Sequence, residues 1–148
     1  MDRPFAIRRL RHEDRPHWDR LWQGYLTFYE ADVPDAVSDL TWSRLMDPEG
    51  PIEAFCAEWA NGALMGVVHY LFHPVTWAAG PRCYLEDLFT ATEARGQGVG
   101  RALIEAVYEA ADARGADQVY WLTAHTNATA RKLYDSVASL TPFVKYRR

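Results

Sequence analysis

Residues 95–101 read RGQGVGR, and this glycine-rich stretch decides the fold that the sequence predicts. Apolar residues follow with helical spacing from about Val99 to Arg114, and an apolar run precedes the glycines, so the stretch should connect a strand to a helix. Glycine lets the backbone approach an anion closely, and the first turn of a helix offers free N–H groups. Arg95 and Arg101 add charge that matches phosphate. The stretch therefore suits a diphosphate, although glycines alone are more typical of a plain turn.

Two common nucleotide-binding loops do not fit this stretch. A Walker loop ends in Gly-Lys-Ser/Thr, whereas this chain has Gly100-Arg101-Ala102 at the corresponding place. A dinucleotide fingerprint that starts at Gly96 would need its third glycine at position 101, which is an arginine. That fingerprint also normally lies in the first βαβ unit of its domain. The glycines therefore belong to neither of these nucleotide folds.

The segments on both sides of the glycines extend the pattern. Residues 84–90 read YLEDLFT before the loop, and residues 127–134 read NATARKLY after the next helix and a short apolar run at 119–121. Together they resemble the GCN5-related N-acetyltransferase (GNAT) superfamily, whose motifs have the forms Arg/Gln-x-x-Gly-x-Gly/Ala and Asn-x-x-Ala-x-x-x-Tyr. The residues that meet these two motifs are Arg95, Gly98 and Gly100, followed by Asn127, Ala130 and Tyr134. The Leu-Glu-Asp-Leu-aromatic strand is most similar to the Hpa2-like and diamine acetyltransferase branch.

The resemblance implies an α/β (α+β) fold of GNAT type, in which one domain spans residues 1–148. Its central sheet would be mixed and mostly antiparallel, would splay between two parallel strands, and would be flanked by about four helices. The apolar patterns and turn residues agree with this architecture. They predict strands over 5–10, 52–59, 63–72, 83–90, 119–123 and 143–146, and helices over 14–30, 38–47, 99–114 and 127–137.

The resemblance also implies acetyl-CoA as the co-substrate, bound where the strand that ends near Thr90 splays from the strand at 119–123. In the family, the pantetheine arm pairs with the first of these strands, by position at Leu88 and Thr90, and Asn127 bonds to the same arm. The diphosphate would lie on the amides of the glycine-rich stretch. The residues expected to bind acetyl-CoA are Leu88, Thr90, Arg95, Gly96, Gln97, Gly98, Val99, Gly100, Arg101 and Asn127.

Direct transfer of an acetyl group to an amine within a ternary complex needs a base, an oxyanion donor and an acid. The resemblance implies that Glu86 is the base, directly or through water, and that Tyr134 is the acid for the leaving thiolate. A splayed strand leaves backbone N–H groups unpaired, and the Leu88 N–H is the candidate oxyanion donor. Successive strand side chains alternate, so Glu86 and Asp87 should face opposite sides unless a bulge intervenes. Asp87 would then be structural or would contact a second substrate amine.

Each of these roles has an alternative. Tyr134 beside Leu133 and Val137 is also compatible with core packing, and Asn127 is compatible with a helix N-cap. Glu86 is also compatible with an exposed edge charge, but a carboxylate pair inside an apolar strand is costly unless it is used. For the whole chain, the alternatives are a non-catalytic acyl-CoA-binding sensor with the same fold and a structural α/β module without affinity for CoA.

In the family, the first two helices and their connection wall the acceptor pocket. This region contains Trp22, Tyr25, Phe28 and Tyr29 together with Glu30, Asp32 and Asp35. Aromatic rings and carboxylates suit a cationic amine, whereas the alternative is a core stripe beside ordinary turn residues. The expected substrate contacts are Tyr25, Tyr29, Glu30 and Asp87. A small polyamine, an aminoglycoside-like amine, an amino acid and a lysine side chain all remain open as acceptors.

Composition narrows the class of protein. With 148 residues, 49% of them hydrophobic and 24% charged, the chain should fold as one domain, and its net charge of -4 argues against binding nucleic acid. No apolar run is typical of a signal peptide or a membrane span. Cys56 and Cys83 do not form a disulfide framework, and His69 and His73 lack a third metal ligand. We therefore expect a cytoplasmic enzyme without a metal, and the aromatic content of 14% and the habit of the family favour a homodimer.

Overall fold

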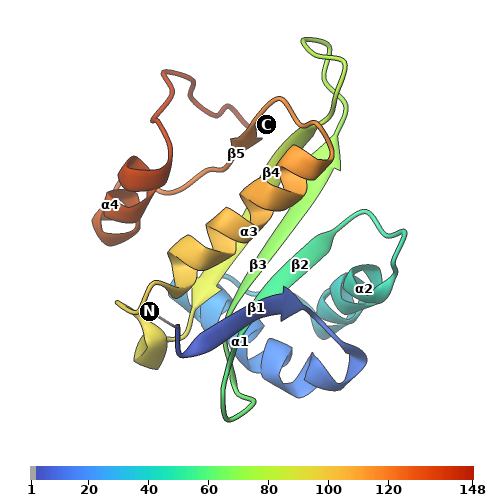
Figure 1. Ribbon diagram of the computed structural model, residues 1–148, viewed down its shortest axis with the longest axis vertical. Helices are drawn as coiled ribbons and strands as arrows, with labels where there is room; N and C mark the ends of the chain where they lie inside the picture. Colours follow the sequence, from blue (N-terminus) through green and yellow to red (C-terminus); the bar gives the residue numbers. More distant parts are fainter. Residues whose placement is uncertain (1–2) are drawn as a thin grey trace.

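In a computed structural model that describes residues 3–148, five strands form one open sheet with helices on both faces (Figure 1). The strands lie side by side in the order β1 (Phe5–Arg9), β2 (Glu53–Trp59), β3 (Leu64–His73), β4 (Arg82–Thr90) and β5 (Val119–Tyr120). The helices are α1 (Arg15–Phe28), α2 (Asp35–Met46), α3 (Val99–Ala113) and α4 (Ala128–Val137), with the short 3₁₀ turns η1 (His12–Asp14) and η2 (Thr92–Ala94). Neighbouring strands are antiparallel except for the parallel pair β4 and β5, which confirms the predicted fold class. None of these helices has the length and apolar character of a membrane span.

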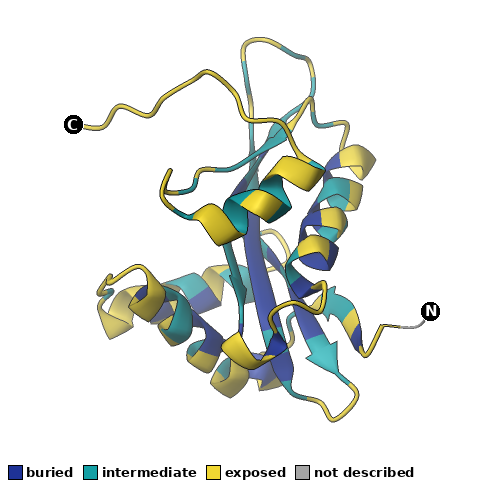
Figure 2. Cartoon of the chain, turned by 90° about the vertical axis from the view of Figure 1, so that its left-hand side faces the viewer, coloured by how far each residue is buried: buried dark blue, intermediate teal, exposed yellow. Residues whose placement is uncertain are grey.

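Two apolar cores hold the sheet between the helices, and Figure 2 shows its buried strands with helices on either side. On one face, Leu103 and Val107 of α3 pack in the same core as Val68 of β3. On the other face, α1 and α2 supply the tryptophans Trp18, Trp22 and Trp42, which pack with Cys56, Leu64 and Val67. Because side chains alternate along a strand, β3 gives Val67 to one core and Val68 to the other. The middle strands are thereby covered on both faces.

Strands β4 and β5 diverge soon after they meet. Their parallel pairing joins Cys83 to Val119 and Tyr84 to Tyr120 and extends no further. The second strand is therefore shorter than the predicted range of 119–123. Beyond this contact, the edge of β4 that faced β5 has no neighbouring strand in the part of the chain that the structure describes.

Backbone amides of β4 point toward this open edge. The Ala91 amide donates to the Met65 carbonyl oxygen, on the β3 side, at 2.8 Å. Residues of an antiparallel strand alternate between its two edges, so the amides of Leu88 and Thr90 point away from β3. The splayed strand thus leaves these two N–H groups without a strand partner.

A β-bulge interrupts β4 at Glu86. The pairing of His69 with Asp87 is followed by a shift in register that leaves Glu86 without a partner on β3. The bulge reverses the alternation of side chains, and Leu85 and Leu88, three residues apart, both pack in the α3 core. Asp87 consequently faces α1, and a bulge, the exception that the sequence left open, interrupts the regular alternation expected of the two carboxylates.

Helix α2 begins earlier than its sequence predicts. It starts at Asp35, directly after Pro34, and not at residue 38 as predicted. Ser38 is buried inside the helix, and its hydroxyl accepts a hydrogen bond from Trp22 Nε1 at 3.0 Å. The serine therefore serves contact between α1 and α2, because a buried indole N–H needs an acceptor.

The strand predicted over 143–146 is wrong. The described chain has no regular structure after Val137, and Phe143, Val144 and Tyr146 are exposed. Figure 2 shows this segment running outward to the C-terminus. A strand needs a neighbour to pair its backbone, and the two-residue β5 offers only a short edge.

Candidate active site

The glycine-rich stretch forms the turn that opens α3. Gly96 and Gly98 have positive φ angles of 77° and 84°, a left-handed conformation that favours glycine, and Gly98 is the N-cap of the helix. The Ala102 amide donates to the Gly98 carbonyl oxygen at 3.0 Å. Within residues 3–148, the backbone amides of 96–101 donate to no backbone carbonyl outside the helix. This row of N–H groups at the positive end of α3 suits an anion such as a diphosphate.

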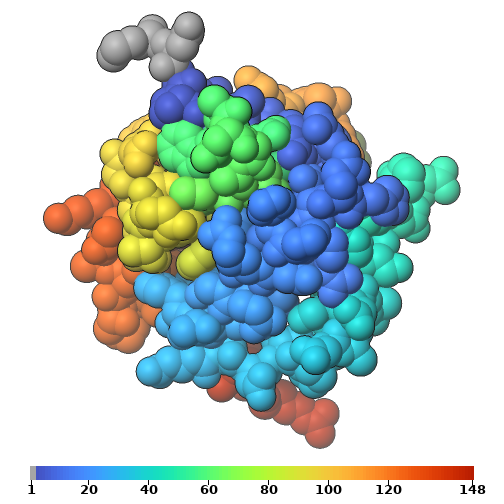
Figure 3. Space-filling view, turned by 90° about the horizontal axis from the view of Figure 1, so that it is seen from below, coloured from blue at the N-terminus to red at the C-terminus, as the bar shows by residue number. Residues whose placement is uncertain are grey.

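Two exposed arginines flank this loop. The Arg95 guanidinium carbon lies 5.9 Å from the ring centroid of Phe28, at the end of α1. Arg101 donates to Ser136 Oγ of α4 at 2.7 Å. The end of α1 (light blue), the loop (yellow) and α4 (orange-red) therefore lie together on the face of the molecule in Figure 3. Both cations are placed at the surface where an anion would approach the loop.

Tyr134 lies on α4 next to the same face. Its ring packs edge-on against Trp121, with ring centroids 5.4 Å apart. Burial, and then the neighbouring Tyr29, raise the pKa of Tyr134 to about 12, so the phenol is protonated at neutral pH. The core-packing alternative holds in part, because Leu133 and Val137 join the α3 core together with Tyr134.

Asn127 occupies the N-cap position of α4, but its side chain makes no capping hydrogen bond. Instead, Asn127 Nδ2 donates to Thr123 Oγ1 at 3.3 Å, in the connection that leaves β5. The capping alternative therefore describes the backbone of Asn127 and not its side chain. The side chain ties the start of α4 to the segment beside the splay.

Asp87 belongs to a chain of hydrogen bonds that begins inside the core. Asp87 Oδ2 lies 2.9 Å from His69 Nδ1, and Trp18 Nε1 donates to His69 Nε2 at 3.0 Å. Trp18 and His69 are fully buried, whereas the Asp87 side chain is 16% exposed. Tyr25 adjoins this carboxylate: burial, and then the charge of Asp87, raise the pKa of Tyr25 far above its usual value. Asp87 is thus held from the interior while part of it reaches solvent.

Glu86 is exposed at the bulge, next to Asp87. Partial burial of its carboxyl group, and then the charge of Asp87, raise the pKa of Glu86, while a hydrogen bond from Tyr84 acts in the opposite direction. A raised pKa makes a carboxylate a stronger base. This is the property that deprotonation of an amine requires.

The last turns of α1 form an aromatic wall beside these carboxylates. The Tyr25 ring stacks on Trp22, with centroids 5.5 Å apart, and lies 4.9 Å from the Tyr29 ring. Trp22 is buried in the core, whereas Tyr29 is 43% exposed. Glu30 follows with an exposed side chain and a φ angle of 53°. The helix therefore serves as core at Trp22 and as site surface at its exposed end.

Sequence reasoning missed Trp18 and His69 as parts of the site. Sequence reasoning considered His69 only together with His73, as a metal pair that lacks a third ligand, and His73 Nε2 lies 2.8 Å from the Tyr120 hydroxyl. The described residues hold no group of three His, Cys, Asp or Glu side chains that would bind a metal. The available signal was a histidine inside the apolar run of β3, because a buried polar ring needs partners.

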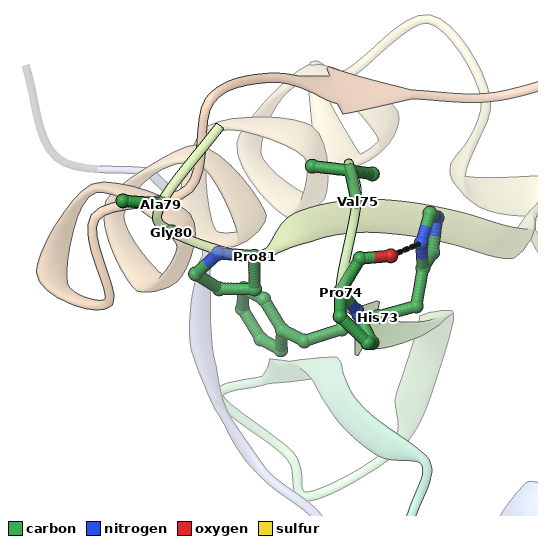
Figure 4. A pocket seen from close by; sticks show the side chains of 7 residues that line it. His73, Pro74, Val75, Ala79, Gly80 and Pro81 are labelled. Atoms are coloured by element: carbon green, nitrogen blue, oxygen red, sulfur yellow. Dashed lines mark hydrogen bonds between the residues drawn. The ribbon is translucent and has the colours of Figure 1, made fainter. Parts of the chain in front are cut away.

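A cavity of about 320 Å³ lies at the connection between β3 and β4 (Figure 4). The residues that line it are Phe72, His73, Pro74, Val75, Ala79, Gly80 and Pro81. In Figure 4 the His73 ring points to the Pro74 carbonyl oxygen, 3.0 Å from His73 Nδ1. None of the predicted site residues lines this cavity, which is therefore separate from the candidate site.

Comparison with known proteins identifies the family. The acetyltransferase (GNAT) family model matches residues 18–138. The D-amino-acid N-acetyltransferase HPA3 of Saccharomyces cerevisiae is 36% identical over 144 residues, which cover 97% of this chain and 89% of the yeast protein. The thialysine N-epsilon-acetyltransferase of Bos taurus is 31% identical over 93 residues, which cover 63% of this chain and 48% of the bovine protein. This chain thus matches about half the length of the bovine relative.

Solved structures show the same fold. The aminoglycoside acetyltransferase AAC(6')-Iy, in complex with a bisubstrate analog, superposes with a TM-score of 0.83 at 21% identity, over 97% of both chains. The ribosomal-protein-alanine N-acetyltransferase of Brucella melitensis biovar Abortus 2308 superposes with a TM-score of 0.80 at 22% identity, again over 97% of both chains. At these identities the likeness concerns the fold.

The chain belongs to the acetyltransferase (GNAT) family, as its motifs predicted. Within that family it lies in the Hpa2-like and diamine acetyltransferase branch, and it is an N-acetyltransferase that depends on acetyl-CoA as co-substrate.

Proposed function

We propose that residues 1–148 form a single N-acetyltransferase domain that acetylates a primary amine of a small molecule by direct attack in a ternary complex. The observation that carries this proposal is the bulged end of β4. It holds the carboxylates Glu86 and Asp87 directly before the amides of Leu88 and Thr90 at the splayed edge. Relatives named for D-amino acids and for thialysine support an amino acid as the first acceptor to try. A lysine side chain of a peptide is the second acceptor class.

Acetyl-CoA would lie along this edge and end at the glycine-rich loop. The backbones of Leu88 and Thr90 would pair with the pantetheine arm, and Asn127 would bond to the same arm from the start of α4. The amides of 96–101 would hold the diphosphate, with Arg95 and Arg101 as the adjacent cations. The free N–H groups and the left-handed glycine backbone support this placement.

Three groups of the chain would carry the transfer. Glu86 would accept the proton that the amine loses, directly or through water, as the amine nitrogen forms its bond to the acetyl carbon. The Leu88 N–H would donate to the carbonyl oxygen while that oxygen carries negative charge. Tyr134 would give its hydroxyl proton to the sulfur as the carbon–sulfur bond breaks. Its pKa of about 12 supports the role of an acid that is loaded at neutral pH.

The acceptor amine would lie between Asp87 and the exposed end of α1. Asp87 supplies a negative charge, and the rings of Tyr25 and Tyr29 supply aromatic faces for a cation. Glu30, exposed at the end of the helix, would add a second negative charge at the rim. Together these groups favour an acceptor that is cationic before it reacts.

We also propose that the enzyme works in the cytoplasm as a homodimer that binds neither nucleic acid nor membrane. The net charge of -4 supports the lack of affinity for nucleic acid. Exposed apolar side chains at the C-terminal end support self-association, because such residues in a group favour a protein interface. They are Leu140, Phe143, Val144 and Tyr146, which are 76% to 92% exposed. Sedimentation of the intact chain measures this directly.

Calorimetric titration with acetyl-CoA tests the proposed cradle. The intact protein should bind, and Gly98→Asp, alone or with Arg95→Ala, should weaken binding at least about 10-fold, because it sets a carboxylate against a phosphate. Gly62→Asp is the matched control, since Gly62 also has a positive φ angle, 87°, and open space around it, but lies in the β2–β3 turn. An unchanged affinity for Gly98→Asp would contradict the cradle.

A panel of primary amines then separates the enzyme from a sensor. The panel contains a diamine, D- and L-amino acids, an aminoglycoside and a lysine peptide. Tyr134→Phe should lower kcat about 100-fold or more on the amine that reacts, with acetyl-CoA affinity unchanged, because it removes the acid and keeps the ring. Binding of acetyl-CoA without acetylation of any amine would favour the sensor.

A further inference from the structure

The hydrogen-bond chain that ends at Asp87 starts at the indole N–H of Trp18, which can only donate a hydrogen bond. An indole N–H is a donor and never an acceptor, so the 3.0 Å contact from Trp18 Nε1 makes His69 Nε2 the acceptor. The ring proton of a neutral histidine must then lie on Nδ1. At 2.9 Å, that N–H donates to Asp87 Oδ2. Trp18 thereby determines the histidine tautomer that faces Asp87.

This arrangement holds Asp87 without neutralising its charge. A neutral imidazole contributes a hydrogen bond and no positive charge. In the described part of the chain, Asp14, Glu53, Glu58 and Asp117 each pair with an arginine, whereas Asp87 has no arginine or lysine partner. A mostly buried carboxylate without a cation is costly, because burial removes part of its hydration. The ammonium group of a bound acceptor would supply the cation that the described chain does not place beside Asp87.

The surroundings of Asp87 fit an ammonium group. The Trp22 ring centroid lies 5.6 Å from that of His69, and Tyr25 stacks on Trp22. Trp22 is buried and stacked between Trp18 and Tyr25, so the rings of the aromatic wall that a cation beside Asp87 can reach are those of Tyr25 and the exposed Tyr29. The bulge at Glu86 aims the carboxylate at this wall, because without the extra residue Asp87 would face the α3 core.

We propose that Trp18 and His69 are positioning residues, which hold Asp87 in one orientation as the receptor for the ammonium group of the acceptor. The inference rests on the proposed placement of the amine beside Asp87. His69 touches neither substrate nor acetyl-CoA; it acts through the carboxylate. Its loss should therefore affect recognition of the amine and leave the acetyl-CoA side of the site unchanged.

Steady-state kinetics of matched variants test this role. His69→Leu removes the hydrogen bond to Asp87 and should raise KM for the amine about 10- to 100-fold, the effect expected for a lost hydrogen bond to a charged group. The KM for acetyl-CoA should not change, and kcat should change less than about 3-fold. His69→Asn keeps an N–H donor near the Nδ1 position and should recover most of the KM. Trp18→Phe keeps an aromatic ring but removes the N–H donor that fixes the tautomer of His69. It should therefore also raise KM for the amine.

A double variant isolates the pathway through the carboxylate. In the Asp87→Asn background, His69→Leu should raise KM for the amine no further, since the group it positions is already absent. Equal KM values for His69→Leu and the parent enzyme, or independent effects of the two substitutions, would overturn the proposal. So would a loss of kcat and of acetyl-CoA affinity in parallel, which describes a purely structural role.

A spectroscopic measurement is independent of activity and of variant stability. Nitrogen chemical shifts of the imidazole in the intact protein should report a protonated Nδ1 and an unprotonated Nε2 for His69, and a bound amine should leave this tautomer unchanged. A protonated Nε2 would overturn the inference even in an active enzyme. An enzyme that acetylates no amine but has the Nδ1 tautomer would contradict the proposed function and leave the hydrogen-bond chain intact.

Discussion

The degree of burial of a titratable side chain decides whether it can take part in chemistry in this protein. Burial raises the pKa of Cys56 to about 12 and that of Cys83 to about 11, so both thiols stay protonated and serve as packing residues. The pKa values of Glu86 and Tyr134 are also raised, but both side chains remain at least partly accessible to solvent. Partial burial therefore shifts the pKa values of the proposed base and the proposed acid, whereas full burial makes the cysteines inert.

The pH dependence of catalysis should report the raised pKa of Glu86. A base must be unprotonated to act, so kcat/KM should fall as the pH drops through a value above the usual glutamate pKa of about 4.3. Glu86→Gln should lower kcat/KM about 100-fold and lose this acid limb. Rates measured from about pH 5 to pH 9 check both effects, with Glu105→Gln on the exposed side of α3 as the control. An acid limb that persists in Glu86→Gln would assign the base elsewhere.

At the scale of elements, the site depends on how closely α3 approaches β3. A Cβ atom built on Gly66 of β3 would lie 2.6 Å from Val99 Cγ1 and 3.1 Å from Leu103 Cδ1. Only a residue without a side chain permits this contact. Val99 is the first residue of α3, so the same contact sets the height of the helix N-terminus above the sheet. The position of the amides proposed to bind the diphosphate thus follows from a packing contact outside the loop.

Gly66→Ala should therefore lower the free energy of unfolding by about 1–3 kcal/mol, the usual effect of overpacking. Acetyl-CoA affinity should fall as well, because the N-terminus of α3 is pushed from the sheet. Urea unfolding and calorimetry measure the two quantities. The double variant Gly66→Ala with Val99→Ala removes the nearest clash and should recover part of both. A free energy of unfolding of Gly66→Ala equal to that of the parent would show that α3 moves away from β3 without strain.

At the scale of the whole molecule, the half-buried Arg8 connects the N-terminal segment to the sheet. Arg8 of β1 donates to Asp14 at 2.8 and 3.0 Å and to Glu58 Oε2 of β2 at 2.6 Å. Burial by itself would raise the pKa of Asp14, but hydrogen bonds from Arg8 and from the Arg11 amide outweigh it and lower that pKa. Asp14 also precedes α1, so the pair places the helix that carries the aromatic wall.

The lowered pKa predicts a specific pH dependence of stability. The folded-state pKa of Asp14 lies below its unfolded value, so its contribution is present above about pH 4 and is lost as the pH falls through the folded-state pKa. Asp14→Asn should lower the free energy of unfolding by about 1–3 kcal/mol at pH 7, with the difference from the parent shrinking in acid. Urea unfolding at several pH values measures it. Asp19→Asn, in an exposed pair with Arg15, should change stability by less than about 1 kcal/mol.

Much of the fold could be predicted from local signals. Asn61-Gly62 between two apolar runs is a strong local signal for a hairpin, here the one that joins β2 and β3. The glycine-rich stretch before the periodic run from Val99 predicted the loop and α3. The prediction of a strand over 143–146 was wrong, although its residues have strand propensity. A strand needs a partner strand that is long enough to pair with it, and that partner is distant in the sequence. The predicted start of α2 was wrong because the Ser38 hydroxyl bonds to Trp22 and does not cap its own helix.

The motifs around 84–134 by themselves determined the family and the class of chemistry, because glycine conformation, helix N-termini and residue spacing act within a few residues. Only the tertiary structure decided which way the carboxylates face, since the bulge at Glu86 exists only in the register between β3 and β4. Likewise, the chain from Trp18 through His69 to Asp87 joins residues 51 and 18 positions apart. Such contacts depend on packing of α1 against the sheet, which no local pattern encodes.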